Sequence, residues 1–213
     1  MKYLTSILFI AAFISFNAQA MQEESGNDTS NDTIKNSLPY FEIPENPSNF
    51  SGGSILSRVI DGLGYRYFWA SEGLREEDLA YKPSDDAASM LETVEHVHGL
   101  SVTILNAAKN LPNIRPYEEL KLTYEEYRGQ SLLNLKEASD LFRTLTEGQL
   151  DSLKVTFQRS EKSSEFPLWN LINGQIADAI YHTGQMVSFR RTTGNPMSPV
   201  VNVFMGKNRE AKK

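Results

Sequence analysis

Cysteine is absent from the 213-residue sequence, and its absence excludes several classes of protein. A disulfide-stabilised scaffold, a thiolate metal site, a cysteine nucleophile and a lipid-modified N-terminal cysteine all need a residue that the chain does not contain. Any metal site must therefore use nitrogen and oxygen donors. Histidine is also scarce, with 3 residues in the chain, so few combinations of histidine ligands are available.

The chain also lacks an excess of positive charge. Its formal net charge is −6, and removal of Lys2 with an N-terminal leader would make it −7. Such an acidic chain offers no electrostatic footprint for nucleic acid or for an anionic membrane surface. A Gly-x-Ser-x-Gly elbow and a Walker-type phosphate loop are absent too, so a serine hydrolase and a nucleotide-binding enzyme have little support. The expected partner is a small-molecule substrate or ligand.

Long apolar runs are confined to the first 20 residues. Lys2, an apolar run from Leu4 to Phe16 and the small-residue ending Ala18-Gln19-Ala20 match a signal peptide over residues 1–20. The run is shorter than the ~20 residues that a membrane-spanning helix needs, although an uncleaved anchor is the competing interpretation. We therefore expect a secreted or periplasmic protein with no stable membrane span after cleavage.

The remainder divides by composition into three parts. Residues 21–53 are rich in Asn, Ser, Asp, Glu and Pro, which is typical of a flexible tether. Residues 54–205 are long enough for one domain with a sizeable core. Residues 206–213 are rich in lysine and are expected to be a disordered tail. A homodimer is compatible with the sequence, but no apolar stripe requires one.

Four segments of the domain have helical spacing. The first runs from Ser54 to Ser71, and the second and third open at Ser89 and Thr123, each with a glutamate three positions later as in a capping box. A fourth is predicted from Pro167 to Gly194, with proline at its first position and glycine at its end. These segments predict an all-α fold, a four-helix bundle with a long loop between helices three and four.

The predicted fourth helix carries two polar residues one turn apart. Asp178 and His182 lie within about 40° of Leu171 and Phe189 around the helix, so they are expected to face the bundle interior. A carboxylate buried there needs a metal, a cation or a proton. The alternative is a structural Asp–His or Asp–Arg pair, with Arg58 or Arg66 as the arginine.

The second helix offers one further ligand. His96 shares a face with apolar residues, whereas His98 is rotated about 200° away from it. His96, Asp178 and His182 are therefore the candidate ligands of a divalent metal ion, with Zn²⁺ first and Ni²⁺, Mn²⁺ or Fe²⁺ as alternatives. Three protein ligands leave coordination positions open for chemistry.

Several motifs resemble those of one family. The order is Asp78-Leu79-Ala80-Tyr81-Lys82-Pro83, then Ser89-Met90-Leu91-Glu92 leading to His96, then His182-Thr183-Gly184-Gln185, and Arg190-Arg191 before Gly194-Asn195-Pro196. This arrangement resembles the DinB-like superfamily of four-helix metalloproteins. The resemblance implies a divalent metal held by one histidine of the second helix and by a His-x-x-x-His pair in the fourth. Asp178 stands where the first histidine of that pair is expected.

Two functions remain open. The first is an exported metal-dependent hydrolase or transferase in which the metal acts as a Lewis acid and Gln185, Tyr181 and Glu95 are possible polar helpers. The resemblance implies transfer or isomerisation with low-molecular-weight thiols, a cofactor pool that export argues against. The second is a non-catalytic exported ligand-binding or stress-related bundle whose His/Asp cluster is structural. The sequence does not identify a substrate.

Overall fold

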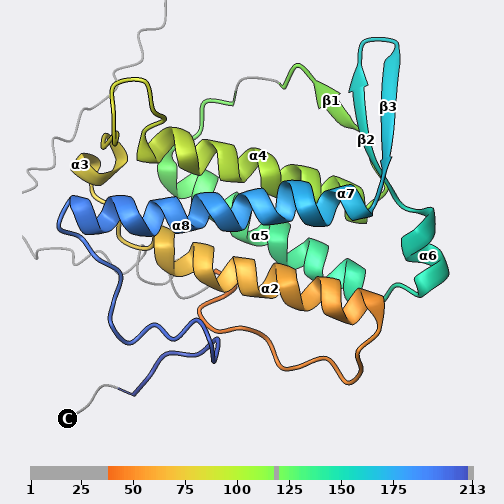
Figure 1. Cartoon of the computed structure of the whole chain (residues 1–213), viewed down its shortest axis with the longest axis horizontal. Coiled ribbons are helices and arrows are strands. Elements are labelled where there is room, and N and C mark those ends of the chain that lie inside the picture. Colours follow the sequence, from red (N-terminus) through yellow and green to blue (C-terminus); the bar gives the residue numbers. More distant parts are fainter. Residues whose placement is uncertain (1–37, 118–119, 211–213) are drawn as a thin grey trace, which may run out of the picture.

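The computed structural model describes residues 38–117 and 120–210 (Figure 1). The predicted signal peptide and residues 21–37 of the predicted tether lie outside the described residues, as do residues 211–213 of the predicted tail. Within the described residues, none of the helices combines the length and the apolar character needed to cross a bilayer.

The chain forms helices and one small sheet in the following order: α2 (Gly52–Ser71), α3 (Glu76–Leu79), α4 (Met90–Ala108), β1 (Asn113–Arg115), α5 (Tyr124–Arg143), α6 (Glu147–Ser152), β2 (Lys154–Arg159), β3 (Lys162–Pro167), α7 (Trp169–Leu171), the π-helical turn η1 (Ile172–Ile176) and α8 (Ala177–Thr192).

The four long helices α2, α4, α5 and α8 pack into a bundle. Helix α5 contacts α2 and α4, and α8 contacts the same two helices on the other side, as Figure 1 shows. Their facing stripes form the core, in which Ile60, Leu63, Ile104, Leu135 and Met186 are fully buried. The bundle follows from the apolar spacing at threes and fours in each segment.

The helix starts predicted from capping boxes are confirmed. The Ser89 hydroxyl accepts a hydrogen bond from the Glu92 backbone N–H at 3.1 Å, and the Glu92 carboxylate accepts one from the Ser89 backbone N–H at 2.7 Å. Thr123 and Glu126 make the same reciprocal pair at the start of α5. These contacts satisfy N–H groups that a helix leaves free at its first turn, and so fix where α4 and α5 begin.

The predicted all-α description is too narrow, because a three-stranded sheet occupies the expected long loop. Strand β2 pairs in parallel with β1 and antiparallel with β3, with Phe157 opposite Asn113 and Lys154 opposite Pro167. Leu153 and Val155 are buried against the bundle, which anchors this hairpin at its base. Pro167 therefore ends edge strand β3 and does not begin the fourth helix.

The predicted fourth helix is interrupted. It starts at Trp169, passes through η1, where Gly174 has φ −93° and ψ −105°, and regains α-helical geometry at Ala177. A π-helical turn accommodates one more residue than an α-helical turn, so it shifts the following residues by about 100° around the axis. The part of the helix after η1 is therefore out of phase with the prediction.

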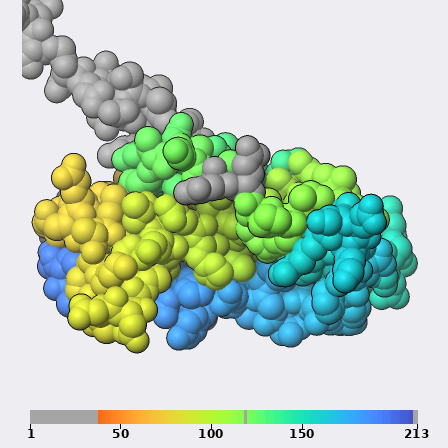
Figure 2. Space-filling model, turned by 90° about the horizontal axis from the view of Figure 1, so that it is seen from above, coloured from red at the N-terminus to blue at the C-terminus, as the bar shows by residue number. Residues whose placement is uncertain are grey.

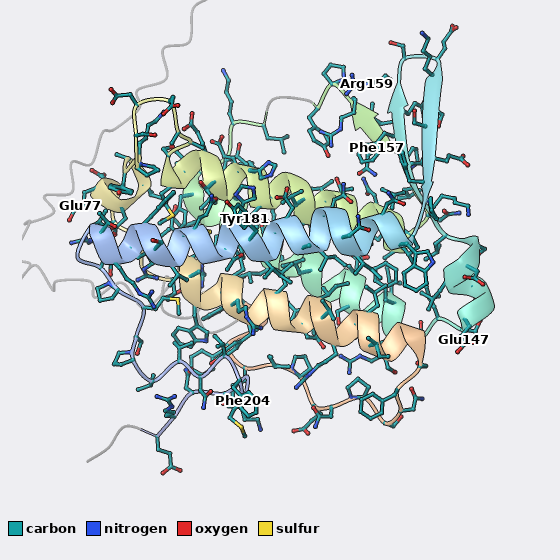
Figure 3. All side chains as sticks on the ribbon, in the orientation of Figure 1. Glu77, Glu147, Phe157, Arg159, Tyr181 and Phe204 are labelled. Atoms are coloured by element: carbon teal, nitrogen blue, oxygen red, sulfur yellow. The ribbon has the colours of Figure 1, made fainter. Side chains whose placement is uncertain are left out.

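The end of the predicted tether is packed against the bundle. Tyr40 is 4% exposed, and its ring lies against Gly64 of α2 where a Cβ atom would be only 2.4 Å away. The Ile43 backbone N–H donates to the Gly206 carbonyl at 2.8 Å, so the segment before α2 is hydrogen-bonded to the segment after α8. Phe204 projects from the C-terminal segment and is 91% exposed (Figure 3).

Candidate metal centre

The three predicted ligands meet where α4 and α8 lie side by side. His96 Nε2 is 3.2 Å from Asp178 Oδ2, and His182 Nε2 is 3.2 Å from Asp178 Oδ1. One donor atom from each residue lies within 4.8 Å of the other two. The Asp178 carboxylate thus stands between two imidazoles that come from different helices.

Local sequence explains this convergence. Asp178 and His182 are four residues apart on α8, which places them one turn apart on the same side of the helix. The Ser89 cap fixes the start of α4 and therefore the direction in which His96 projects. The imidazole rings of His96 and His182 stand edge to face with centroids 4.6 Å apart. The contact between α4 and α8 is therefore enough to bring the two rings together.

The donor set fits a divalent ion. Bonds of about 2.0–2.2 Å from an ion to nitrogen and oxygen place neighbouring donors about 3.0–3.5 Å apart in tetrahedral or octahedral geometry. The two nitrogen-to-oxygen separations of 3.2 Å are in this range and reach different oxygens of Asp178; as a set, one donor atom from each residue lies within 4.8 Å of the others, so the side chains would close in slightly around an ion. Two imidazoles and one carboxylate on one side of an ion also leave positions open, as in the facial arrangement of two histidines and one carboxylate.

The cluster is more exposed than predicted. The exposed side-chain fractions are 49% for His96, 42% for Asp178 and 23% for His182. The prediction that these residues face the interior is therefore wrong, and the triad lies at the rim of the contact between α4 and α8. The cause is η1: the buried residues of α8 are Ala179, Thr183, Met186 and Arg190, and all but Met186 lie one position after a residue of the predicted line.

The proton arrangement of His182 favours a cation in the cluster. Its Nδ1 is 2.7 Å from Gln185 Oε1, and in the neutral tautomer that donates from Nδ1 to this oxygen, Nε2 is an acceptor. That lone pair then faces Asp178 Oδ1, which is also an acceptor, at 3.2 Å. Two acceptors at this distance repel unless a proton or a metal ion lies between them, and an outer hydrogen bond of this kind is typical of metal-binding histidines.

The arginines proposed as alternative partners bind elsewhere. Arg58 donates to the Pro44 carbonyl at 2.8 Å, and Arg66 donates to the Gly62 carbonyl at 2.9 Å. The Asp–Arg alternative is therefore wrong. The Asp–His contacts of the other alternative are present, and they involve the same atoms that a metal ion would use.

Two of the three predicted polar helpers are next to the triad. Gln185 holds His182, and the Tyr181 ring is 5.4 Å from the His182 ring while 65% exposed; Figure 3 labels it on α8. Glu95 instead lines a separate cleft with His98 on another side of α4. There His98 Nε2 meets Gln130 Oε1 at 3.2 Å, and burial lowers the pKa of His98. His98 is therefore separate from the triad, as predicted.

A cleft of about 310 Å³ opens beside the triad. It lies between α4, α8 and the loop before α4, which Figure 2 shows in yellow to yellow-green beside the blue of α8. Its lining includes His96 and His182, and also Thr93, Phe189 and the loop residue Ala88. The sequence analysis did not name these three as site residues, although Phe189 was placed on the same line of its helix as His182 and Thr93 lies about one turn before His96.

Comparisons with known proteins found a similar chain among solved structures. The sequence matches no protein-family profile and no curated protein. Among solved structures it is similar to a DinB-like protein from Bacillus subtilis, with 15% sequence identity over 67% of this chain and 96% of that chain, and a TM-score of 0.49. That protein carries the name of the family whose motifs this sequence resembles.

Proposed function

We propose that this chain is an exported metal-binding protein that acts as a metal-dependent hydrolase or transferase on a small molecule. His96, Asp178 and His182 would hold the divalent ion. The observation that carries the proposal is the convergence of these side chains from two helices, with both histidine nitrogens 3.2 Å from Asp178 oxygens. Zn²⁺ suits this donor set best, and Ni²⁺, Mn²⁺ and Fe²⁺ are the alternatives.

The chain's own residues prepare the site for chemistry. Gln185 holds the His182 ring so that Nε2 faces Asp178, and Asp178 balances part of the charge of an ion. The cleft beside His96 and His182 provides a place where a small molecule can lie against the open side of the triad. A bound divalent ion would supply Lewis acidity, which polarises a substrate group or acidifies a water or a thiol.

The predicted signal peptide bears on the choice between reactions. Hydrolysis needs only water, which is available in every compartment, whereas thiol transfer needs a low-molecular-weight thiol outside the cell. Export therefore favours hydrolysis over thiol transfer. The net charge of −6 supports a small molecule over nucleic acid as the partner.

Metal analysis tests the proposal directly. The protein without residues 1–20 is loaded with Zn²⁺, Ni²⁺, Mn²⁺ or Fe²⁺, desalted and measured by elemental mass spectrometry. We expect one ion per chain for the wild type and for His98→Ala, and loss of the ion in His96→Ala, Asp178→Ala and His182→Ala. Absence of stoichiometric metal in the wild type would reject the proposal, and metal retained by the triad variants would reject the ligand assignment.

The non-catalytic alternative is favoured by one observation. His96 Nε2 is within hydrogen-bonding distance of Asp178 Oδ2 at 3.2 Å, so these residues can form a structural polar pair that merely shapes the cleft. Hydrolysis of para-nitrophenyl acetate by the zinc-loaded protein, compared with Asp178→Ala, separates the two functions. Turnover that depends on Asp178 supports the enzyme, whereas metal binding with equal background rates in both proteins supports the binding protein.

A further inference from the structure

A second cleft, of about 290 Å³, lies where α4 and α5 pack together. Its lining comes from α4, from α5 and from the connection between these helices, and includes Glu95, His98, Val102, Tyr117, Leu120 and Tyr127. Among the described residues, none lines both this cleft and the cleft beside the triad. The second cleft is therefore a separate candidate site.

The wall of this cleft includes a glycine that close packing does not require. Gly99 lies in the middle of α4, where glycine is less favourable than alanine. Among the described atoms beyond its own stretch of helix, a Cβ atom at Gly99 would have Tyr117 Cε2 as its nearest neighbour, at 4.0 Å, an ordinary contact. At Gly64 of α2, by contrast, a Cβ atom would be 2.4 Å from the Tyr40 ring. Gly64 thus permits a close contact within the protein, whereas Gly99 leaves room in the cleft.

The two tyrosine hydroxyl groups in the cleft wall donate hydrogen bonds within the protein. Thr103 Oγ1 donates to the Gly99 carbonyl at 3.1 Å, so the Tyr117 hydroxyl donates to Thr103 Oγ1 at 3.0 Å. The Tyr127 hydroxyl donates to the Leu120 carbonyl at 2.7 Å. An anion in the cleft would therefore find no free hydroxyl donor on either tyrosine, whereas both rings can attract a cation through their π electrons.

The charged group in the described wall of the cleft is a carboxylate. Glu95 is the acidic residue there, and none of the described lining residues is lysine or arginine. Arg115 stacks on the Tyr117 ring, 3.2 Å from its centroid, but it does not line the cleft. Glu95 makes no ion pair with any described residue, unlike Glu92, which is paired with Lys82. A positively charged ligand would supply a counterion for Glu95.

We propose that the cleft between α4 and α5 binds a small organic cation, an ammonium group attached to a compact apolar group such as a single ring. The ammonium group would pair with the Glu95 carboxylate, and attraction to the tyrosine rings would add to this pairing. A volume of about 290 Å³ corresponds to on the order of ten water molecules at about 30 Å³ each, which suits a ligand of this size. The proposal does not depend on the metal centre.

Three probes of similar size and different charge test the proposal. Benzylammonium is positive, benzyl alcohol is neutral and benzoate is negative. Their binding to the metal-free protein without residues 1–20 is measured by nuclear magnetic resonance, and the shifted backbone amides locate each probe. We expect benzylammonium to shift the amides of Gly99 and Val102 and to bind roughly tenfold more tightly than benzyl alcohol, with benzoate the weakest.

Three variants show whether the cleft and its carboxylate are responsible. Glu95→Gln keeps the size of the side chain and removes its charge, so the preference for benzylammonium over benzyl alcohol should fall to about threefold or less. Glu161→Gln, at an exposed glutamate in the turn between β2 and β3, is the matched control and should keep the wild-type preference (Figure 1). Gly99→Leu fills the cleft and favours the helix, so both probes should lose most of their binding while urea denaturation shows no loss of stability.

The outcomes separate this proposal from the metal centre. Equal affinities for benzylammonium and benzyl alcohol in the wild type would overturn it, as would an unchanged preference in Glu95→Gln or full binding in Gly99→Leu. Shifts confined to the surroundings of Asp178 would place the cation at the triad and would also overturn it. Zinc binding is measured separately on the same proteins, so a wild type that holds no zinc overturns the proposed function alone.

Discussion

Two carboxylates in the bundle, Asp61 and Asp178, have opposite surroundings. Asp61 on α2 is fully buried, and it receives hydrogen bonds from Arg143 at 2.7 Å, Ser139 at 2.6 Å and Tyr40 at 3.1 Å. Burial and the charge of Asp61 raise the pKa of the Tyr40 phenol, so the phenol stays a neutral donor. Asp61 is thus supplied with a permanent cation and fixed donors by the fold itself.

Asp178 has no such permanent cation among the described residues. Its side chain is 42% exposed, and its charged partners are the two imidazoles, which carry positive charge only when protonated. The position of Asp61 is therefore complete without a ligand, whereas the electrostatic balance at Asp178 depends on a proton or a metal ion. This difference indicates that Asp61 serves stability and that Asp178 is available for binding.

The largest expected effect is a loss of stability when the Asp61 carboxylate is removed. Asp61→Ala leaves Arg143 without its carboxylate and leaves the buried Tyr40 hydroxyl without an acceptor, and removal of one partner of a buried pair costs about 3–5 kcal/mol. Urea denaturation of the metal-free protein measures this loss. Asp140→Ala, at an exposed carboxylate of α5, is the control and should change stability by less than about 0.5 kcal/mol. A loss of similar size in both variants would contradict the role assigned to Asp61.

The next effect concerns Asp178, for which we expect a small loss of stability and a large loss of metal binding. Asp178→Ala should change the stability of the metal-free protein by less than about 1 kcal/mol, because its contacts are partly exposed. Because Asp178 would bind the ion directly, its loss should weaken zinc binding by more than the roughly 10–100-fold caused by loss of a residue that only hydrogen-bonds a metal ligand. Competition with a chromogenic chelator measures the affinity. A destabilisation as large as that of Asp61→Ala, with zinc affinity retained, would show that Asp178 is also a structural carboxylate.

A smaller effect is expected one contact away from the triad. Gln185→Leu removes the acceptor of the His182 Nδ1–H while keeping a side chain of similar length, so zinc affinity should fall by about 10–100-fold. Gln185→Glu restores an acceptor at the same position and should bind zinc at least as well as the wild type. Equal affinities for all three proteins in the chelator assay would mean that Gln185 does not orient His182.

The parts of the fold that were predicted correctly depend on residues that are close together in sequence. The starts of α4 and α5 follow from the capping pairs at Ser89 and Thr123, each completed three residues later. The pairing of three strands into a sheet was not predicted, because β2 is stabilised by pairing with residues far away in sequence, such as Phe157 with Asn113. Pro167 was misassigned for the same reason: edge strand β3 accepts a proline as readily as the first turn of a helix does.

The candidate site likewise has one feature that was predicted from residues close in sequence and one that was not. The grouping of His96, Asp178 and His182 was predicted because a four-residue spacing and one neighbouring helix are enough to bring them together. Their exposure was not predicted, because one additional residue in η1 rotates everything after it by about 100°. No periodicity before or after Gly174 reveals that insertion, since each half of the segment is regular by itself.

The smallest effect concerns His98, the histidine whose surroundings resemble those of Asp61 more than those of the triad. It is 5% exposed, it shares its cleft with Glu95 and Tyr127, and burial lowers its pKa. As pH falls below the ordinary histidine pKa of about 6.5, the unfolded chain takes up a proton before the folded protein does, so His98 makes stability fall with pH. His98→Gln removes this contribution, and urea denaturation of the metal-free protein from about pH 7.5 to about pH 5.5 should show a shallower decline than the wild type. An identical decline in both proteins would mean that His98 takes up its proton as easily when folded as when unfolded, and that its burial has no electrostatic consequence.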